Sequence, residues 1–146
     1  MHKQIFLNIA VDNLERSKAF FAKLGFTFEP RFTDQNAACM IVGENIFTML
    51  LTKPFFSTFT SKPLSDPSTS TEALICLSCD SRAEVDDLVA KAVAAGGTAP
   101  RKPQDYGFMY GHGFEDPDGH IWELAFMDPN VPMPERPAES ATPAAN

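Results

Sequence analysis

The sequence lacks a hydrophobic run long enough to cross a membrane. None of its apolar stretches approaches the roughly 20 residues that a transmembrane helix needs. The first residues, from Met1 to Gln4, also lack the charged and then apolar pattern of a signal peptide. We therefore expect no membrane association and a cytoplasmic location.

Positive charge is scarce as well. The 146 residues include 12 Lys and Arg against 19 Asp and Glu, which gives a formal net charge of -7. Binding to nucleic-acid phosphates needs a basic face. The composition therefore argues against a nucleic-acid partner.

Cysteine is limited to Cys39, Cys76 and Cys79. An odd count without an export signal predicts free thiols in a reducing compartment. Cys76 and Cys79 have CxxC spacing, but they lie in a strand-like run, in which residues three apart face opposite sides. A redox pair favours a helix N-terminus instead. We therefore interpret these two cysteines as core packing residues.

The first module, residues 3–52, has the pattern of a strand, a helix and three further strands. The segment from Asp12 to Glu15 has the form of a capping box with Asp12 as the N-cap, and Gly25 fits a helix end. Apolar residues at helical spacing lie between these two signals. The expected strands cover residues 5–11, 26–32, 37–42 and 46–52.

The second module, residues 72–128, repeats this order. Ser81 to Glu84 forms another capping box, and Gly96 ends the helix that follows. A tight turn from Asp116 to Gly119 leads into the last strand. The expected strands cover residues 72–79, 98–101, 108–111 and 120–127. The chain is therefore an internal βαβββ repeat.

Two segments fall outside the repeat. Residues 53–71 form a connector rich in Ser, Thr and Pro that also carries Phe55, Phe56 and Phe59. These phenylalanines are expected either at an interface or as a lid over the site. Residues 129–146 form a Pro-rich C-terminal tail that is expected to lack helix and central strand.

Two segments resemble the vicinal oxygen chelate superfamily, which includes glyoxalase I, extradiol dioxygenases and bleomycin- and fosfomycin-resistance proteins. VDNLERSKAFF, from Val11 to Phe21, resembles its first strand-to-helix segment, and FEDPDGHIWEL, from Phe114 to Leu124, its last hairpin. Residues 108–111 add a likeness to an uncharacterised bacterial branch. The resemblance implies an α+β fold in which residues 1–128 form one domain, with two tandem βαβββ modules making a cupped eight-stranded sheet.

The resemblance also implies where a metal would be bound. Metalloenzymes of this group hold a divalent ion through side chains on four strands inside the cup. The matching positions here are Phe6, Leu50, Leu74 and Glu123. Three of these residues cannot ligate a metal, and a stable site needs about three protein ligands. We therefore expect no cofactor, with one divalent metal ion as the alternative.

Glu123 is the candidate catalytic or anchoring residue, because a carboxylate in an apolar cup can transfer a proton or hold a hydrogen-bonding ligand. His112, near the mouth, is a second candidate, as a ligand contact or general base. His120 should point out of the cup with Trp122. The expected pocket residues are Phe6, Asn8, Leu50, Leu74, Tyr110 and Glu123.

These observations favour a protein that binds a small, partly apolar molecule in a metal-free cup. The alternative is a metal-dependent lyase, isomerase or dioxygenase of the same superfamily, since one fold can host both. Open sheet edges and the connector phenylalanines predict a homodimer.

Overall fold

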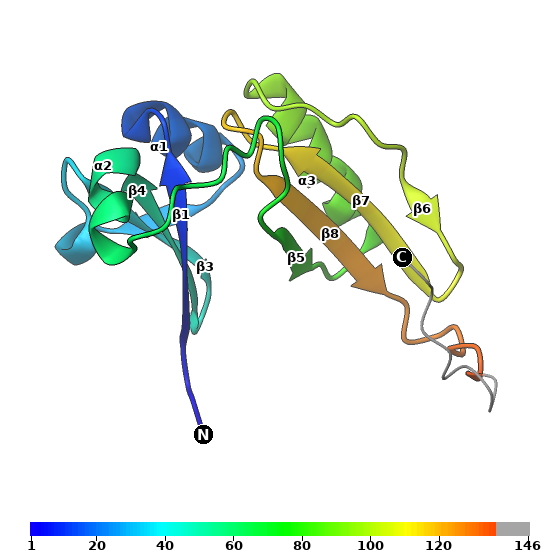
Figure 1. The fold of residues 1–146 in the computed structure, drawn as a ribbon. Coiled ribbons are helices and arrows are strands. Elements are labelled where there is room, and N and C mark those ends of the chain that lie inside the picture. The colour runs from blue at the N-terminus through cyan, green and yellow to red at the C-terminus, as the bar shows by residue number, and fades with distance from the viewer. Residues whose placement is uncertain (137–146) are drawn as a thin grey trace.

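The computed structural model describes residues 1–136 of the chain (Figure 1). The first module contains β1 (Ile5–Val11), α1 (Leu14–Lys23), β2 (Thr27–Glu29), the 3-10 turn η1 (Pro30–Phe32), β3 (Ala37–Gly43) and β4 (Ile46–Thr52). The connector begins with α2 (Lys53–Phe56) and the 3-10 turn η2 (Ser57–Phe59). The second module contains β5 (Leu74–Ser78), α3 (Arg82–Ala94), β6 (Gln104–Asp105), β7 (Met109–Glu115) and β8 (Ile121–Met127).

The α+β class and the βαβββ repeat are confirmed. The strands form two four-stranded sheets, in the orders β1-β4-β3-β2 and β5-β8-β7-β6. In each sheet the first strand pairs in parallel with the last strand, and the other pairs are antiparallel. Within residues 1–136 no ladder joins the two sheets, so one chain holds two separate half-cups instead of a continuous eight-stranded sheet (Figure 1).

The expected strand over residues 98–101 does not form. Only Thr98 makes an isolated antiparallel bridge, to Glu115, and pairing resumes at β6. Pro100 and Pro103 explain the gap, because proline has no N–H to donate to a ladder. Pro30 similarly ends β2 early and begins η1.

The first helix begins one residue later than expected. Asn13, not Asp12, is the N-cap of α1, and its side chain accepts from the N–H of Arg16 at 3.0 Å. Asp12 instead pairs with Lys53 at 3.4 Å and donates its N–H to Asp118 at 2.8 Å. The second helix begins as expected, with Ser81 accepting from the N–H of Glu84.

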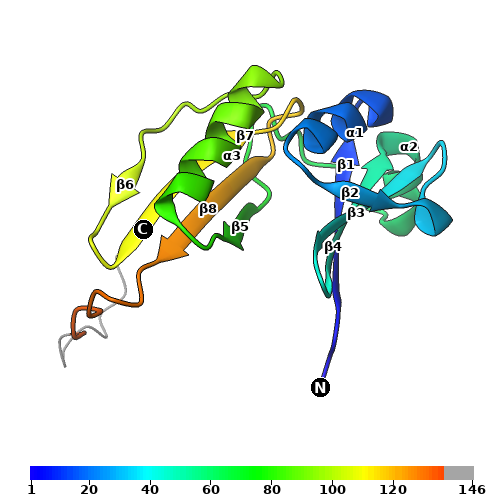
Figure 2. The ribbon, with the colours of Figure 1, turned by 180° about the vertical axis from the view of Figure 1, so that it is seen from behind.

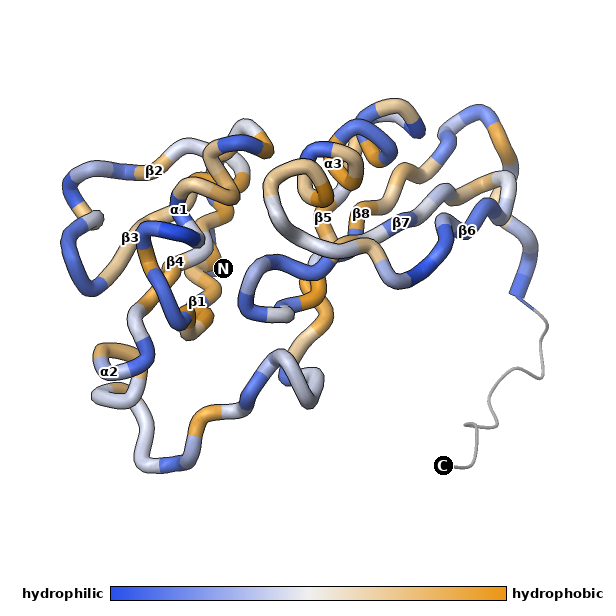
Figure 3. The backbone as a smooth tube through the Cα atoms, turned by 90° about the horizontal axis from the view of Figure 1, so that it is seen from above, coloured by the Kyte–Doolittle hydropathy of each residue, from blue (hydrophilic) through white to orange (hydrophobic). Residues whose placement is uncertain are grey.

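One apolar core spans both modules. The ring of Phe21 on α1 lies 5.2 Å from that of Trp122 on β8, and Phe20 lies 6.0 Å from Phe114 on β7. Helix α1 of the first module therefore covers part of the second sheet. Figure 2, seen from behind, shows α3 in front of the second sheet and α1 next to α3. Figure 3 shows apolar residues concentrated along the strands, in particular β1, β4, β5 and β8.

Each sheet has an inner face, toward the helices and the core, and an outer face on the other side. Successive residues of a strand alternate between them. Glu123, Cys76 and Ala125 lie on the outer face of the second sheet, and Phe6 and Asn8 lie on that of the first. The outer faces are therefore where a binding site can form.

None of the helices within residues 1–136 combines the length and apolar character of a membrane span. The tail, expected over residues 129–146, lacks helix and strand as far as residue 136. Its remaining residues lie outside the described part of the chain.

Candidate functional site

A pocket of about 310 Å³ lies over the outer face of the second sheet. Its walls are mostly apolar, and Met109, Ile121 and Ala125 belong to them. Glu123 and Cys76, on the neighbouring strands β8 and β5, contribute polar side-chain atoms to its lining. A set of exposed polar residues surrounds one side of it: Arg101, Lys102, Gln104 and Tyr106.

Two glycines make this pocket deep. Gly111 and Gly113 lie opposite Ala125 and Glu123 in the β7–β8 register, so this stretch of β7 places no side chain on the outer face. A Cβ built on Gly113 would lie 2.9 Å from the carbonyl oxygen of Trp122, so only glycine fits there without a shift of the backbone. The floor of the pocket is therefore bare backbone.

Glu123 stands beside this floor and directly opposite Cys76 on β5. Within residues 1–136, the Glu123 carboxylate accepts no hydrogen bond. The nearby side chains of Tyr110, His112 and Trp122 donate instead to Asp86, to the Arg101 carbonyl and to Asp116. The carboxylate is thus available to a ligand. Burial, and then the charge of Glu123, raise the pKa of the Cys76 thiol, so the thiol stays protonated at neutral pH.

Cys79, directly after β5, is buried in the core, as the sequence predicts. Cys76 is exposed and lines the pocket, so its assignment to the core was wrong: residues three apart on a strand face opposite sides, and only one of the two can face the core. Burial is the main cause that raises the pKa of Cys79 to about 11, followed by the charges of Glu84 and Asp80. Neither thiol of the CxxC segment is therefore activated for redox chemistry.

His112 belongs to the lining of the pocket, although it alternates with Gly111 and Gly113 along β7 and so starts from the other face of the strand. Its Nε2 lies 3.0 Å from the carbonyl oxygen of Arg101. A carbonyl only accepts, so Nε2 carries the proton and donates to it. His112 thus ties the segment that carries Arg101 to β7.

Tyr110, expected in the pocket, faces the other side of β7. Its hydroxyl donates to Asp86 of α3 at 2.6 Å, and the guanidinium of Arg82 lies 5.0 Å from its ring centre. The residue is one position away from Gly111 along the strand, and one position changes the face. The assignment of Tyr110 to the pocket was wrong for this reason.

The residues expected from the first module do not reach this pocket. Phe6 and Asn8 lie on the outer face of the first sheet, whereas Leu50 is fully buried in the core opposite Ile9. Leu50 was therefore wrongly assigned to the pocket, and its neighbour Leu51 occupies the outer face instead. Leu74 is 60% exposed, on the edge strand β5.

Asn8 lines a second pocket of about 270 Å³, with Leu51, Phe56 and Phe59. The connector helix α2 and η2 therefore cover part of the first sheet's outer face. Phe55 and Phe59 pack edge to face at 5.2 Å, and Phe59 remains 70% exposed. Within one chain, Asn8 and Glu123 thus belong to different pockets.

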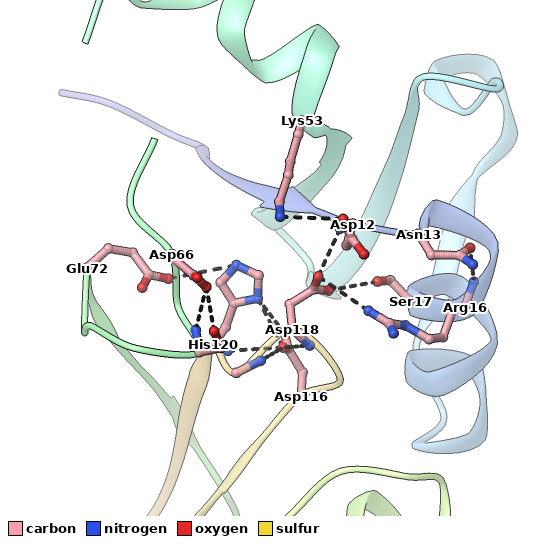
Figure 4. Close-up of polar contacts among 12 residues, drawn as sticks. Asp12, Asn13, Arg16, Ser17, Lys53, Asp66, Glu72, Asp116, Asp118 and His120 are labelled. Carbon is pink, nitrogen blue, oxygen red and sulfur yellow. Dashed lines mark hydrogen bonds and ion pairs between the residues drawn. The ribbon is translucent and has the colours of Figure 1, made fainter. Parts of the chain in front are cut away.

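The β7–β8 turn holds the clearest polar cluster of the described residues (Figure 4). The buried carboxylate of Asp116 accepts from the backbone N–H groups of Asp118, Gly119 and His120, from His120 Nδ1 at 2.8 Å and from Trp122 Nε1 at 3.1 Å. Gly119 adopts φ +100°, which favours glycine. The turn is thus held in one conformation by a single carboxylate.

Asp118 joins this turn to the first module. Its carboxylate accepts from the Asp12 N–H at 2.8 Å and from the Ser17 hydroxyl at 3.3 Å, and it pairs with Arg16 at 3.4 Å (Figure 4). No local pattern in the sequence predicts this contact, because Asp118 lies 106 residues from Asp12.

A scan of protein families matches residues 3–124 to the Glyoxalase/Bleomycin resistance protein/Dioxygenase superfamily. The chain belongs to this superfamily. The resemblance seen in the two sequence segments is thereby confirmed, and the duplicated βαβββ order agrees with it. A search of curated proteins finds no match.

Several solved structures share this fold. A hypothetical protein from S. aureus is 28% identical over 86% of this chain and 95% of its own, with a TM-score of 0.73. A glyoxalase-related enzyme from Fulvimarina pelagi is 21% identical over 86% of this chain and 88% of its own, with a TM-score of 0.71. The fosfomycin resistance protein FosX from Mesorhizobium loti is 16% identical over 86% of this chain and 92% of its own, with a TM-score of 0.62.

The metal ion of the superfamily's metalloenzymes does not fit the residues of this pocket. Of the four matching positions, Phe6 and Leu74 are apolar, and both Leu50 and its neighbours Met49 and Leu51 lack an oxygen or nitrogen ligand. Glu123 alone has a ligand of the usual kind. Among residues 1–136, only Asp116, Asp118 and His120 form a compact group of possible ligands.

That group is occupied by hydrogen bonds. Both oxygens of Asp116 accept from N–H groups, and those of Asp118 accept from the Asp12 N–H and the Ser17 hydroxyl. His120 Nδ1 points at Asp116, on the side of β8 away from Glu123, as predicted from the sequence. Inward-pointing N–H groups oppose a cation, so the cluster serves the fold of the turn.

Proposed function

We propose that this chain binds a small, partly apolar molecule in the pocket on its second sheet, without a bound metal ion. The observation that carries the proposal is a hollow of about 310 Å³ with a glycine floor, mainly apolar walls and one carboxylate, Glu123. Ligand pockets in proteins commonly combine apolar walls with a few placed polar groups.

Glu123 is the anchor in this proposal. Its carboxylate has no hydrogen bond from residues 1–136, so it can accept one from a hydroxyl or amine of the ligand. The protonated Cys76 thiol beside it is a weak donor. Glu123 could also transfer a proton from this position. His112 takes no part in such a step in this proposal, because its Nε2 donates to the carbonyl of Arg101.

A second copy of the chain completes the cup in this proposal. Apolar side chains are exposed around the first sheet: Ile5 at 58%, Phe6 at 49% and Ile46 at 47%. Strands β1 and β5 are edges of their sheets, and edges with apolar neighbours favour association. A homodimer that sets the first sheet of one copy over the second sheet of the other would cover both surfaces.

The test combines metal analysis with binding of a neutral apolar fluorophore, N-phenyl-1-naphthylamine. Protein purified without added metal should contain well below one divalent ion per chain and should bind the fluorophore. Ala125→Phe, which fills the pocket beside Gly111, should abolish the binding. About one metal ion per chain that is lost in Glu123→Ala would overturn the metal-free proposal in favour of a metal-dependent lyase, isomerase or dioxygenase.

A further inference from the structure

Two cations stand at the mouth of the pocket in a protein that has an excess of acids. Arg101 and Lys102 are exposed and line it together. Neither takes part in any ion pair among residues 1–136. The two neighbouring positive charges repel each other. With no acidic partner, they do not stabilise the fold.

The backbone fixes where these cations stand. Pro100 and Pro103 flank the pair and restrict its backbone on both sides. His112 donates to the carbonyl of Arg101, and β6 pairs with β7 directly afterwards. The segment is therefore held along the outer edge of β7, although it forms no ladder of its own.

The two cations lie on one side of the glycine floor, and the carboxylate of Glu123 lies on the other. Across the sheet the order is the segment of Arg101 and Lys102, then Gly111 and Gly113 on β7, then Glu123 on β8. Two strand spacings amount to roughly 10 Å. The other carboxylate of the lining, Glu115, lies at the end of β7, beside Thr98 and away from Gly111.

We propose that the pocket selects small molecules with a flat apolar body and an acidic group, such as a carboxylate, sulfonate or phosphate, that meets Arg101 and Lys102. The inference rests on the function proposed above and specifies its ligand class. The apolar body lies on the bare floor formed by Gly111 and Gly113. Any hydrogen-bond donor on the far end of the ligand meets Glu123.

A matched pair of fluorophores tests this. 8-Anilinonaphthalene-1-sulfonate and N-phenyl-1-naphthylamine share the same aromatic body and differ by one sulfonate. The acidic probe should bind about tenfold more tightly at low salt, because each exposed ion contact adds a modest Coulomb attraction. Raising the salt concentration should reduce this preference.

The combined variant Arg101→Gln and Lys102→Gln should remove the preference and leave binding of the neutral probe unchanged. The control removes two exposed charges from the helices instead, with Lys23→Gln and Lys91→Gln, and should keep the preference. Equal binding of both probes in the wild type, or a preference that survives in the pocket variant, overturns this inference and leaves the proposed function standing. Absence of binding by either probe, or binding that Ala125→Phe does not affect, overturns both.

Discussion

The two sheets have equivalent strand orders, but the side chains on their outer faces differ in size. On the first sheet the outer face is filled by large side chains, with Phe6 stacked on Phe47 at 4.9 Å. On the second sheet the corresponding face carries Gly111, Gly113 and Ala125 around a single carboxylate. One copy of the repeat thus carries stacked aromatic rings on its outer face, with a pocket only where α2 and η2 cover Asn8 and Leu51, and the other carries a pocket with a glycine floor. The size of a few side chains decides how open each outer face is.

The β7–β8 turn and the exposed β3–β4 turn of the first module differ in how they are held by hydrogen bonds. This difference gives the largest expected effect. Asp116→Ala removes the acceptor of five N–H groups and leaves those of Trp122 and His120 buried without a partner. We expect a loss of about 4 kcal/mol in the free energy of unfolding, measured by urea denaturation. The same change at Glu44, in the exposed turn of the first module, should cost less than about 0.5 kcal/mol. A small loss in Asp116→Ala would contradict the structural role of this turn.

The apolar face of the first sheet can be tested through assembly. Phe6→Asp places a charge among the exposed apolar residues, so the dissociation constant of the proposed dimer should rise by about 100-fold or more. Light scattering and sedimentation velocity measure this. Phe32→Asp is the control, because Phe32 is equally apolar and 60% exposed but lies in η1. A wild-type monomer at micromolar concentration would refute the dimer.

The two glycines of the pocket floor should respond differently to substitution by alanine. Gly113→Ala places a Cβ 2.9 Å from a backbone oxygen, so it should destabilise the fold by about 2 kcal/mol. Gly111→Ala meets only the Leu124 oxygen, at 3.6 Å, and should be neutral or stabilise by about 0.5 kcal/mol. Thermal unfolding of the two variants, measured side by side, checks the difference. Equal stability of the two variants would contradict the close approach of β7 and β8 at Gly113.

The smallest expected effect is a pH dependence at His120. Burial lowers the pKa of its ring, but the hydrogen bond and charge of Asp116, with the charges of Glu72 and Asp118, outweigh burial and raise it. The stability that protonation adds is therefore present below the unfolded pKa of about 6.5 and is lost as pH rises through the folded value. The difference in unfolding free energy between wild type and His120→Gln should be larger at pH 6 than at pH 9.

Glu72 provides the check on that pH dependence. Its carboxylate lies 3.8 Å from His120 Nε2, the nitrogen that gains the proton. In a Glu72→Gln background the difference between pH 6 and pH 9 should shrink. An equal or opposite pH trend would show that the ring does not titrate as the surrounding charges imply.

The order of the elements could be predicted because its signals are local. Helix caps, turn residues and strand alternation identify the repeat without any knowledge of packing. The face of the sheet on which each side chain lies was harder to predict, because a shift of one residue along a strand exchanges the inner and outer faces. Leu50 and Tyr110 were assigned to the pocket for this reason, whereas Glu123 was placed on the correct face.

Contacts between distant segments could not be read from the sequence. Asp12 is a good N-cap residue, and only the approach of Asp118 from the β7–β8 turn explains why Asn13 takes that position. Similarly, the segment around Arg101 resembles a strand in composition, but prolines prevent the ladder and leave the cations at the pocket mouth. The pocket itself depends on the β7–β8 register, which places two glycines beside Glu123.

The contact between Asp118 and helix α1 also has a consequence for how the chain reaches its native state. Every strand ladder closes within one module, whereas Asp118 bonds to Arg16 and Ser17 of α1, 102 and 101 positions away. Closing so long a loop costs entropy that local pairing does not. We therefore expect each module to gain its sheet first, with Phe20 and Phe21 still open to solvent, and the docking of α1 onto the second sheet to come last. During synthesis, the first module emerges before Trp122 and Phe114 exist to cover those rings, so the nascent half-chain passes through a stage in which aggregation competes with folding.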